Sequence, residues 1–213
     1  MLWIPLFGLL SACFGQDAPA PEVVAPPPPP PECVDRAELV PGIDKADPRL
    51  TADHLIVVRK ADRRVQLFEK GVATAGSGTD GKACYRVGLG FAPAGHKQRQ
   101  GDGKTPEGWY PTSDKPWSSF YAAIAVHYPN AQDAEAAVAD GRISRKVGDT
   151  ITSADKARKK PPQTTPMGGE ILLHGGGSST DWTLGCVALE DTHIDDLRSH
   201  LPKGIRVWVR VLP

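Results

Sequence analysis

The sequence lacks three features that would identify common classes of protein. Among its 213 residues, 25 Lys and Arg balance 25 Asp and Glu, and no basic block occurs. Nucleic-acid-binding domains carry a basic patch or stripe, so this composition indicates no nucleic-acid partner. No apolar run reaches the roughly 20 residues that a membrane-spanning helix needs, which excludes a polytopic membrane protein. No internal repeat is present, and the length predicts one good-sized domain.

The N-terminus is poor in charge. Residues 1–12 have no charged side chain and are mostly apolar, as in the core of a signal peptide, although no Lys or Arg precedes them. They end in Leu-Ser-Ala before Cys13, which resembles the bacterial lipobox. We therefore predict a signal peptide over residues 1–12, lipidation of Cys13 and an exported, membrane-anchored lipoprotein of the cell envelope or periplasm. The alternative is an ordinary secretory signal in which Cys13 is incidental.

The next segment is dominated by proline. Residues 17–32 are rich in Pro and include an unbroken run at 26–31. Such a segment favours extended polyproline II and forms no ladder hydrogen bonds. We predict a proline-rich linker over residues 13–50, followed by one folded domain over residues 51–213. The linker is either a stiff spacer or a segment of no selected length.

The body of the chain has mainly the patterns of β-strands. A mostly β domain with a few helices (α+β) is therefore predicted. The strand candidates are residues 54–58, 65–68, 85–89, 109–110, 120–128, 170–174, 187–189 and 205–211. Helices are predicted over residues 131–140 and after a capping box formed by Thr192 and Asp195. Residues 142–163 are polar and basic and are predicted to be an insertion or lid over the domain.

Two of the strand candidates place an imidazole and a thiol close together. His174 ends one apolar run, and Cys186 follows Gly185 at the start of another. A thiol is mostly protonated near neutral pH, so a nucleophilic cysteine needs a partner such as histidine. The imidazole could take the thiol proton, or hold the thiolate as an ion pair. By spacing alone, a buried cysteine and an unrelated histidine at a strand end are the better interpretation.

The residues around this pair resemble the L,D-transpeptidase (YkuD-type) catalytic domain family. That family has His-Gly, a loop, and then Ser/Thr-x-Gly-Cys followed by an aliphatic residue; here His-Gly stands at 174–175 and Thr-Leu-Gly-Cys-Val at 183–187. A second family block matches Gly-Asp-Gly-Lys-Thr-Pro-Glu-Gly at 101–108. Several blocks in order are more specific than one motif. Further matches to one branch lie at residues 88–91, 95–97, 128–131 and 181–182.

The resemblance implies a β-sandwich-like catalytic domain and a role for each matched residue. Cys186 would be the nucleophile and His174 the general base, oriented by the Gly175 carbonyl. The Gly185 and Cys186 amides would stabilise the oxyanion. Thr183 and Trp182 are expected at the substrate cleft; Trp182 is equally typical of a packing aromatic. The 101–108 block is expected to support the cleft.

The implied substrate is a peptidoglycan stem peptide, which Cys186 would attack to form a thioester. An amine of another stem peptide, or a lysine of an envelope protein, would resolve the thioester in cell-wall crosslinking or protein attachment. With water as acceptor the enzyme would be a carboxypeptidase, an endopeptidase or an amidase that cleaves protein–murein links. No cofactor and no metal are predicted, because His96, His127 and His193 have irregular spacing for zinc.

Two positions depart from the family pattern. Leu184 stands where many members have His, and Ala188 where many have an Arg that contacts a substrate carboxylate. This pattern is similar to members that cleave protein–peptidoglycan links. The alternative of another class is a peptidoglycan-binding lipoprotein without catalysis, which would not need to keep His174 and Cys186.

The four cysteines leave one possible pair. If Cys13 is lipidated and Cys186 is catalytic, Cys33 and Cys84 remain. In an oxidising compartment these two are predicted to form a disulfide between the linker and an early strand. The alternative is that Cys33 stays free.

Overall fold

The computed structural model describes residues 33–213, and the predictions of a signal peptide, of Cys13 lipidation and of a linker before residue 33 lie outside this range. The described range contains nine strands and three α-helices, which confirms the predicted mostly β class. The strands are β1 (Leu55–Arg59), β2 (Arg64–Glu69), β3 (Val72–Ala73), β4 (Cys84–Arg86), β5 (Gly108–Asp114), β6 (Ile124–Val126), β7 (Leu172–His174), β8 (Val187–Ala188) and β9 (Trp208–Leu212). The helices are α1 (Ala131–Ala139), α2 (Arg145–Lys156) and α3 (Asp191–Ser199), with short 3-10 turns η1 (Ala37–Leu39), η2 (Pro48–Thr51) and η3 (Thr79–Gly81).

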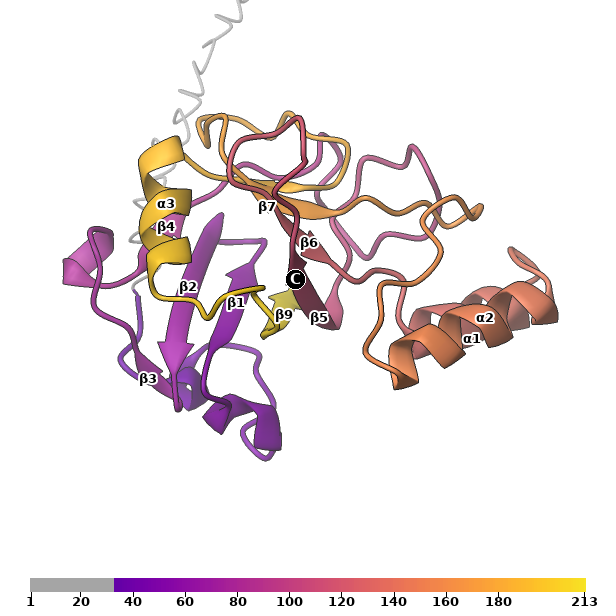
Figure 1. The fold of residues 1–213 in the computed structure, drawn as a ribbon, viewed down its shortest axis with the longest axis horizontal. Coiled ribbons are helices and arrows are strands. Elements are labelled where there is room, and N and C mark those ends of the chain that lie inside the picture. Colours follow the sequence, from indigo (N-terminus) through magenta and orange to yellow (C-terminus); the bar gives the residue numbers. More distant parts are fainter. Residues whose placement is uncertain (1–32) are drawn as a thin grey trace, which may run out of the picture. The chain divides into compact units, whose positions relative to one another are not determined.

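The strands form one continuous path in the order β3-β2-β1-β9-β5-β6-β7-β8, and β4 also pairs with β2. β9 runs parallel to β1, and β8 runs parallel to β7. β5 changes partner along its length: residues 108–111 pair with β9, and residues 112–114 pair with β6. The C-terminal strand β9 thus lies in the middle of the sheet, and β5 joins its two halves (Figure 1).

Both faces of β1 are buried, which explains the apolar run at residues 55–58. Ile56 and Val58 belong to the main core together with residues of α3. Leu55 and Val57 point to the opposite face and pack in a second apolar cluster. Because residues 55–58 contact apolar neighbours on both faces of the strand, apolar and polar residues do not alternate there.

The second cluster corrects the predicted boundary of the linker. Residues 33–50 pack on this face of β1 through the buried side chains of Ala37, Val40, Ile43 and Leu50. Arg36 also forms a β-bridge with Val72. The structure therefore assigns residues 33–50 to the folded domain rather than to the predicted linker.

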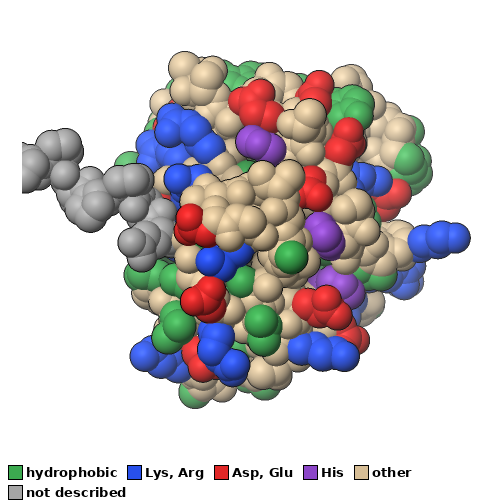
Figure 2. All heavy atoms as spheres, turned by 90° about the vertical axis from the view of Figure 1, so that its left-hand side faces the viewer, with side chains coloured by type: hydrophobic (Ala, Val, Ile, Leu, Met, Phe, Trp, Pro, Cys, Tyr) green, Lys and Arg blue, Asp and Glu red, His purple; other side chains and the backbone are tan. Residues whose placement is uncertain are grey.

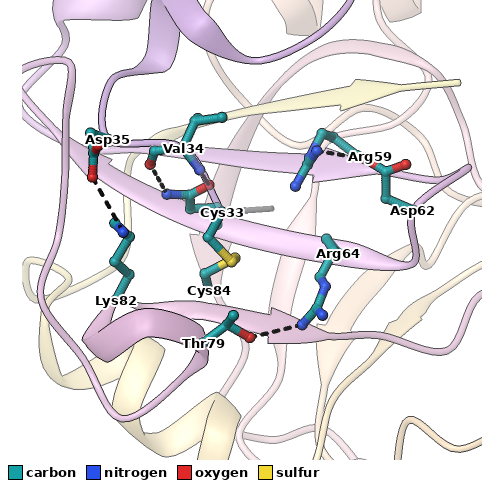
Figure 3. The surroundings of a disulfide bond; sticks show 10 residues. Cys33, Val34, Asp35, Arg59, Asp62, Arg64, Thr79, Lys82 and Cys84 are labelled. Atoms are coloured by element: carbon teal, nitrogen blue, oxygen red, sulfur yellow. Dashed lines mark hydrogen bonds and ion pairs between the residues drawn. A yellow bond between two sulfur atoms is a disulfide. The ribbon is translucent and has the colours of Figure 1, made fainter. Parts of the chain in front are cut away.

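Cys33 and Cys84 form a disulfide that links this N-terminal segment to the start of β4 (Figure 3). Beside it, Gln66 of β2 bonds the backbone of Val34 twice: its side-chain amide donates to the carbonyl at 2.6 Å and its oxygen accepts from the N–H at 3.2 Å. The segment is thus held by one covalent bond, by backbone pairing and by apolar contacts.

Two local predictions differ from the structure. β6 covers Ile124–Val126 and not residues 120–128, because Ala122 has a left-handed backbone (φ 49°) that ends the extended conformation. α3 begins at Asp191 with Glu190 as its N-cap and no side-chain cap bond, so the predicted capping box is wrong. Asp195 instead accepts a hydrogen bond from the Tyr121 hydroxyl at 2.7 Å.

The region 142–163, which is predicted to be an insertion or lid, contains the helix α2. α2 packs against α1, where Gly148 lies against the side chain of Val138 and Ile151 is fully buried. Figure 1 shows the two helices side by side, away from β1 and β2. None of the α2 residues lines the cavity described below.

The surface near β2 and α3 mixes charges of both signs. Figure 2 shows acidic and basic side chains interspersed on this face without a field of one sign. Within residues 33–213, no helix has the length and apolar character to cross a membrane.

Candidate active site

The β7–β8 pair brings His174 and Cys186 to one cavity. Leu173 pairs with Val187, so in the parallel register Cys186 lies opposite Leu172, two positions before His174. Side chains two positions apart on paired strands share a face of the sheet. Both residues line a cavity of about 520 Å³. Its lining consists of Lys97, Gln100, Gly101, Phe120, Gln163, Gly168, Gly169, Glu170, Ile171, His174, Trp182, Thr183, Leu184 and Cys186.

The opposite face of the same strands is the main core. Leu173 and Val187 are buried there. Leu172 and Cys186 instead form a small separate cluster with Ala123 and Ala125. The alternation of β7 therefore fixes which side chains face the cavity.

The His174 ring is held by the backbone of its neighbour. Its Nδ1 lies 2.5 Å from the Gly175 carbonyl oxygen, as the predicted orienting role requires. A carbonyl only accepts, so Nδ1 carries the proton and the lone pair remains on Nε2. Nε2 is buried and has no hydrogen-bond partner among the described residues. Burial lowers the pKa of His174, against the opposing effect of the Gly175 bond, so the ring is a neutral base near pH 7.

A side chain at position 175 would require the Asp191 and Tyr121 side chains to move. A Cβ at this position would lie 2.2 Å from Oδ1 of Asp191. Asp191 begins α3 and accepts a hydrogen bond from the Gly176 N–H at 2.8 Å. The helix terminus therefore positions the backbone that orients the histidine.

Two aromatic side chains enclose the His174 ring. Phe120 stacks on it with ring centroids 4.4 Å apart, and Trp182 meets it edge-on at 5.7 Å. Trp182 is thus part of the site. Of the two roles that the sequence allows, a cleft residue and a packing aromatic, the structure favours the first. Phe120 was missed, because it was assigned to a strand. These rings keep water from His174, which is fully buried.

The Cys186 thiol is buried and protonated. Burial raises its pKa to about 11, although the Leu172 backbone amide and the charge of Lys115 act to lower it. Its Sγ lies 3.5 Å from the Glu170 carbonyl oxygen, to which the thiol donates. The thiol is therefore directed to a backbone carbonyl and not paired with His174 as thiolate and imidazolium.

Thr183 and Gly185 shape the turn before the nucleophile. The Thr183 hydroxyl donates to the Cys186 carbonyl at 2.8 Å and accepts from the Gly185 N–H at 3.1 Å. This differs from the predicted oxyanion role of Gly185, because its amide is already used within the turn. The Cys186 amide remains the predicted oxyanion donor. Thr183 lines the cavity but is only 4% exposed, so its bonding to the turn is its main role.

Gly185 also permits close contact with the 101–108 block. Its φ is +131°, and a Cβ there would lie 2.5 Å from the Lys104 carbonyl oxygen. Only glycine fits such an approach in this conformation. The block therefore touches the residue next to the nucleophile, as its expected supporting role implies.

Asp102 organises that block. Its carboxylate accepts from the amides of Gln98, Arg99 and Lys104 and from the Lys97 ammonium at 2.8 Å. Burial alone would raise the pKa of Asp102, but these bonds outweigh it and hold the value at about 2. Lys97 is almost fully buried, and the Asp102 carboxylate neutralises its charge.

The 88–91 and 181–182 segments flank the nucleophile turn. Gly88 pairs with Ala188 by two backbone bonds of 2.8 and 2.9 Å, and Thr183 pairs with Leu89 at 3.0 Å. Asp181 forms an ion pair of 2.7 Å with Arg63 of the β1–β2 turn. Ala188 is fully buried, whereas Leu184 is 73% exposed at the cavity mouth.

The other histidines lie elsewhere in the domain. His96 accepts from the Glu107 N–H and contacts Asp133, so it joins the 101–108 block to α1. His127 bonds Ser113, and His193 stacks on Tyr85. None of the three lines the cavity with Cys186.

Comparison with known proteins gives a family match over most of the chain. The family model of the L,D-transpeptidase catalytic domain matches residues 53–209. No curated protein sequence matches the chain.

Solved structures match the domain with TM-scores below one half. The helical cell shape determining protein Pgp2 from Campylobacter jejuni is 23% identical over 74% of this chain and 46% of its own, with a TM-score of 0.46. Bd1075 from Bdellovibrio bacteriovorus is 23% identical over 76% and 48%, with a TM-score of 0.43. An L,D-transpeptidase from Xylanimonas cellulosilytica is 13% identical over 77% and 62%, with a TM-score of 0.43. The matched region spans about half the length of the first two structures.

Proposed function

Because the chain belongs to the L,D-transpeptidase catalytic domain family, we propose that it is a cysteine acyltransferase that acts on peptidoglycan stem peptides. The observation that carries this proposal is the state of His174. Its Nδ1 is fixed on Gly175, and its Nε2 lone pair is unused in the cavity that also contains the Cys186 thiol. Buried nitrogens of His127, His193 and His200 also lack a hydrogen-bond partner among the described residues, but of these histidines only His174 lines the cavity with Cys186.

The proposed reaction begins with proton transfer. The Cys186 thiol leaves the Glu170 carbonyl and gives its proton to Nε2 of His174, which makes the imidazole cationic. The sulfur attacks the carbonyl carbon of the peptide bond that precedes a terminal D-alanine, and the oxyanion meets the Cys186 amide. His174 returns its proton to the leaving amine, the carbon–nitrogen bond breaks, and a thioester remains on Cys186.

A second nucleophile then resolves the thioester. Neutral His174 accepts a proton from an incoming amine or water, and the sulfur leaves as a thiol when that proton returns. With an amine from a second stem peptide or a protein lysine, the outcome is crosslinking or protein attachment.

Hydrolysis is the second candidate, and Leu184 favours it. This side chain occupies the cavity mouth, where many relatives carry a histidine that could assist the acceptor amine. His174 is the single imidazole among the described residues that line the cavity. Water as acceptor would make the enzyme a carboxypeptidase, an endopeptidase or an amidase of protein–murein links.

Incubation with purified murein peptides, followed by mass analysis of peptides and protein, tests the proposal. We expect an intact-protein mass increase from an acyl group on Cys186, and loss of D-alanine from the peptide. A crosslinked dimer identifies transfer, and a trimmed monomer identifies hydrolysis. Full activity of Cys186→Ala would contradict the mechanism. Peptide binding without turnover in the wild type would instead identify a non-catalytic binder.

We also propose that the enzyme is exported and anchored through a lipidated Cys13. The Cys33–Cys84 disulfide supports an oxidising compartment. Fractionation of cells that express wild type or Cys13→Ser tests this, because only the wild type should accompany the membranes. Equal release of both proteins would indicate an ordinary secretory signal.

A further inference from the structure

A second hollow adjoins the catalytic cavity. It has a volume of about 600 Å³ and shares Phe120 and Glu170 with the cavity that contains Cys186. Trp117 at its edge is 79% exposed. Its lining residues are Lys115, Trp117, Ser118, Ser119, Phe120, Lys160, Glu170 and Leu172.

The charges in this hollow do not balance. Lys115, which follows β5, and Lys160, which follows α2, both form ion pairs with the Glu170 carboxylate, one at each oxygen. The three are the charged residues of the lining. Two ammonium groups therefore share one carboxylate, and one positive charge is left over. The Lys160 and Glu170 side chains are 32% and 51% exposed, so an incoming solute can reach them.

Glu170 connects this charge to the nucleophile. Its carbonyl oxygen is the group 3.5 Å from the Cys186 thiol, while its side chain extends to the lysines. Its backbone is left-handed (φ 53°), and its N–H donates to Gln163 at 2.7 Å. Glu170 thus contacts the thiol with its backbone and both lysines with its side chain.

The catalytic cavity has no other available cation among the described residues. Lys97 is the one Lys or Arg among the described residues of its lining, and Asp102 neutralises it. Ala188 is fully buried and carries no charge. A peptide carboxylate bound near the thiol would therefore find its counter-charge at the lysine pair.

We propose that Lys115 and Lys160 form a binding subsite for a carboxylate of the peptide substrate, and that the Glu170 side chain occupies this subsite in the free enzyme. This inference rests on the proposed function, because it names how the same site recognises its substrate. The substrate class is a peptide with a free carboxylate near the cleaved bond, because the hollow that contains the lysines shares Phe120 and Glu170 with the catalytic cavity. Trp117 and Phe120 provide apolar walls for the carbon chain of that residue.

The proposal predicts opposite effects for the two kinds of charge. Removing a lysine weakens binding of the carboxylate. Removing the charge of Glu170 eliminates the internal competitor and strengthens binding. A merely structural ion-pair cluster would not discriminate between an acidic peptide and its neutral analogue.

The test measures binding of one synthetic stem peptide, as free acid and as amide, by calorimetry in the Cys186→Ala background. For the free acid we expect Lys115→Met and Lys160→Met each to raise Kd about fivefold, and Glu170→Gln to lower it about as much, since partly exposed ion pairs have this size. The Kd of the amide should stay unchanged in all three. Lys159→Met is the matched control, because Lys159 is exposed and adjacent in sequence; it should not change either Kd.

Equal effects on the acid and the amide, no effect of the lysine variants, or no binding of either peptide would overturn the subsite. The same peptides are given in parallel to the enzyme with Cys186 intact, with the thioester followed by intact mass. Absence of the thioester together with selective acid binding would overturn the proposed catalysis and leave the subsite supported. A thioester without selective binding of the acid would overturn the subsite and leave the proposed catalysis supported.

Discussion

The reactivity of Cys186 should depend on pH as that of a buried neutral thiol. Raising the pH is the perturbation, and the thiolate is the reactive species. With a pKa of about 11, about one Cys186 in ten thousand is thiolate at pH 7. A free cysteine with a pKa of about 8.5 is about 3% thiolate at that pH, so Cys186 should react about 300-fold more slowly. From pH 7 to pH 10 its alkylation rate should rise about a thousandfold without a plateau.

The assay is alkylation by iodoacetamide, quantified by peptide mapping of the Cys186 peptide in a Cys13→Ser background. Cys33 and Cys84 are in a disulfide and do not compete. His174→Ala should leave the profile nearly unchanged, because the resting thiol donates to Glu170 and not to the imidazole. A plateau with a midpoint below pH 8, abolished in His174→Ala, would refute this reasoning and establish a thiolate–imidazolium pair.

Three further substitutions test the supports of the site. Gly185→Ala should abolish turnover, because its Cβ would lie 2.5 Å from the Lys104 carbonyl oxygen. The control is Gly177→Ala, which has a similarly positive φ but open space around it, so it should retain turnover and show only the backbone cost of about 1–3 kcal/mol. Equal activities of the two variants would contradict the proposed contact with Lys104. Thr183→Val should lower kcat and destabilise the fold by about 1–3 kcal/mol, because the Thr183 hydroxyl bonds two backbone groups of the turn. Thr183→Ser keeps the hydroxyl and should restore both kcat and stability. If Thr183→Ser did not restore them, the hydroxyl would not be the group that supports the turn. The double variant Cys33→Ser/Cys84→Ser should lose about 4 kcal/mol in urea unfolding, as expected for a bridge between residues 51 apart, and an unchanged urea midpoint would show that the apolar contacts of residues 33–50 suffice.

The sequence predicted those strands and helices whose own run of apolar or helix-forming residues identifies them. The strands β1, β2, β7 and β9 follow from their apolar runs, and α1 from its composition and the glycine after it. The positions of His174 and Cys186 followed from ordered family blocks, and the parallel pairing of β7 and β8 places them on one face. In contrast, the predicted linker includes residues 33–50, because the first strand pattern of the sequence lies at residues 54–58. Their few apolar side chains are buried only because the outer face of β1 needs a cover, which is a tertiary effect.

The residues missed around the site share a reason. Phe120 and Glu170 lie just before short strands, and their roles depend on turns with left-handed backbone at Ala122 and at Glu170 itself. Lys115 and Lys160 are 45 positions apart and meet at Glu170 only in the folded chain. No spacing rule brings such residues together. The hydrogen bond from the Gly185 amide to the Thr183 hydroxyl also could not be predicted, because the motif specifies residue types and not which backbone amides are already hydrogen-bonded.

The disulfide also determines how the domain would carry a mechanical load. A pull that arrives at Cys33 passes through the sulfur bridge into Cys84, so η1, η2, β1, β2 and β3 lie in a closed covalent loop that the load bypasses. If Cys186 holds a wall peptide as the proposed thioester while the N-terminus is anchored, the tension runs between residues 84 and 186. The strands inside the loop, including β1 with both faces buried, lie off the covalent path of the load. A tethered enzyme built in this way could be strained at its catalytic half while its N-terminal half keeps its fold.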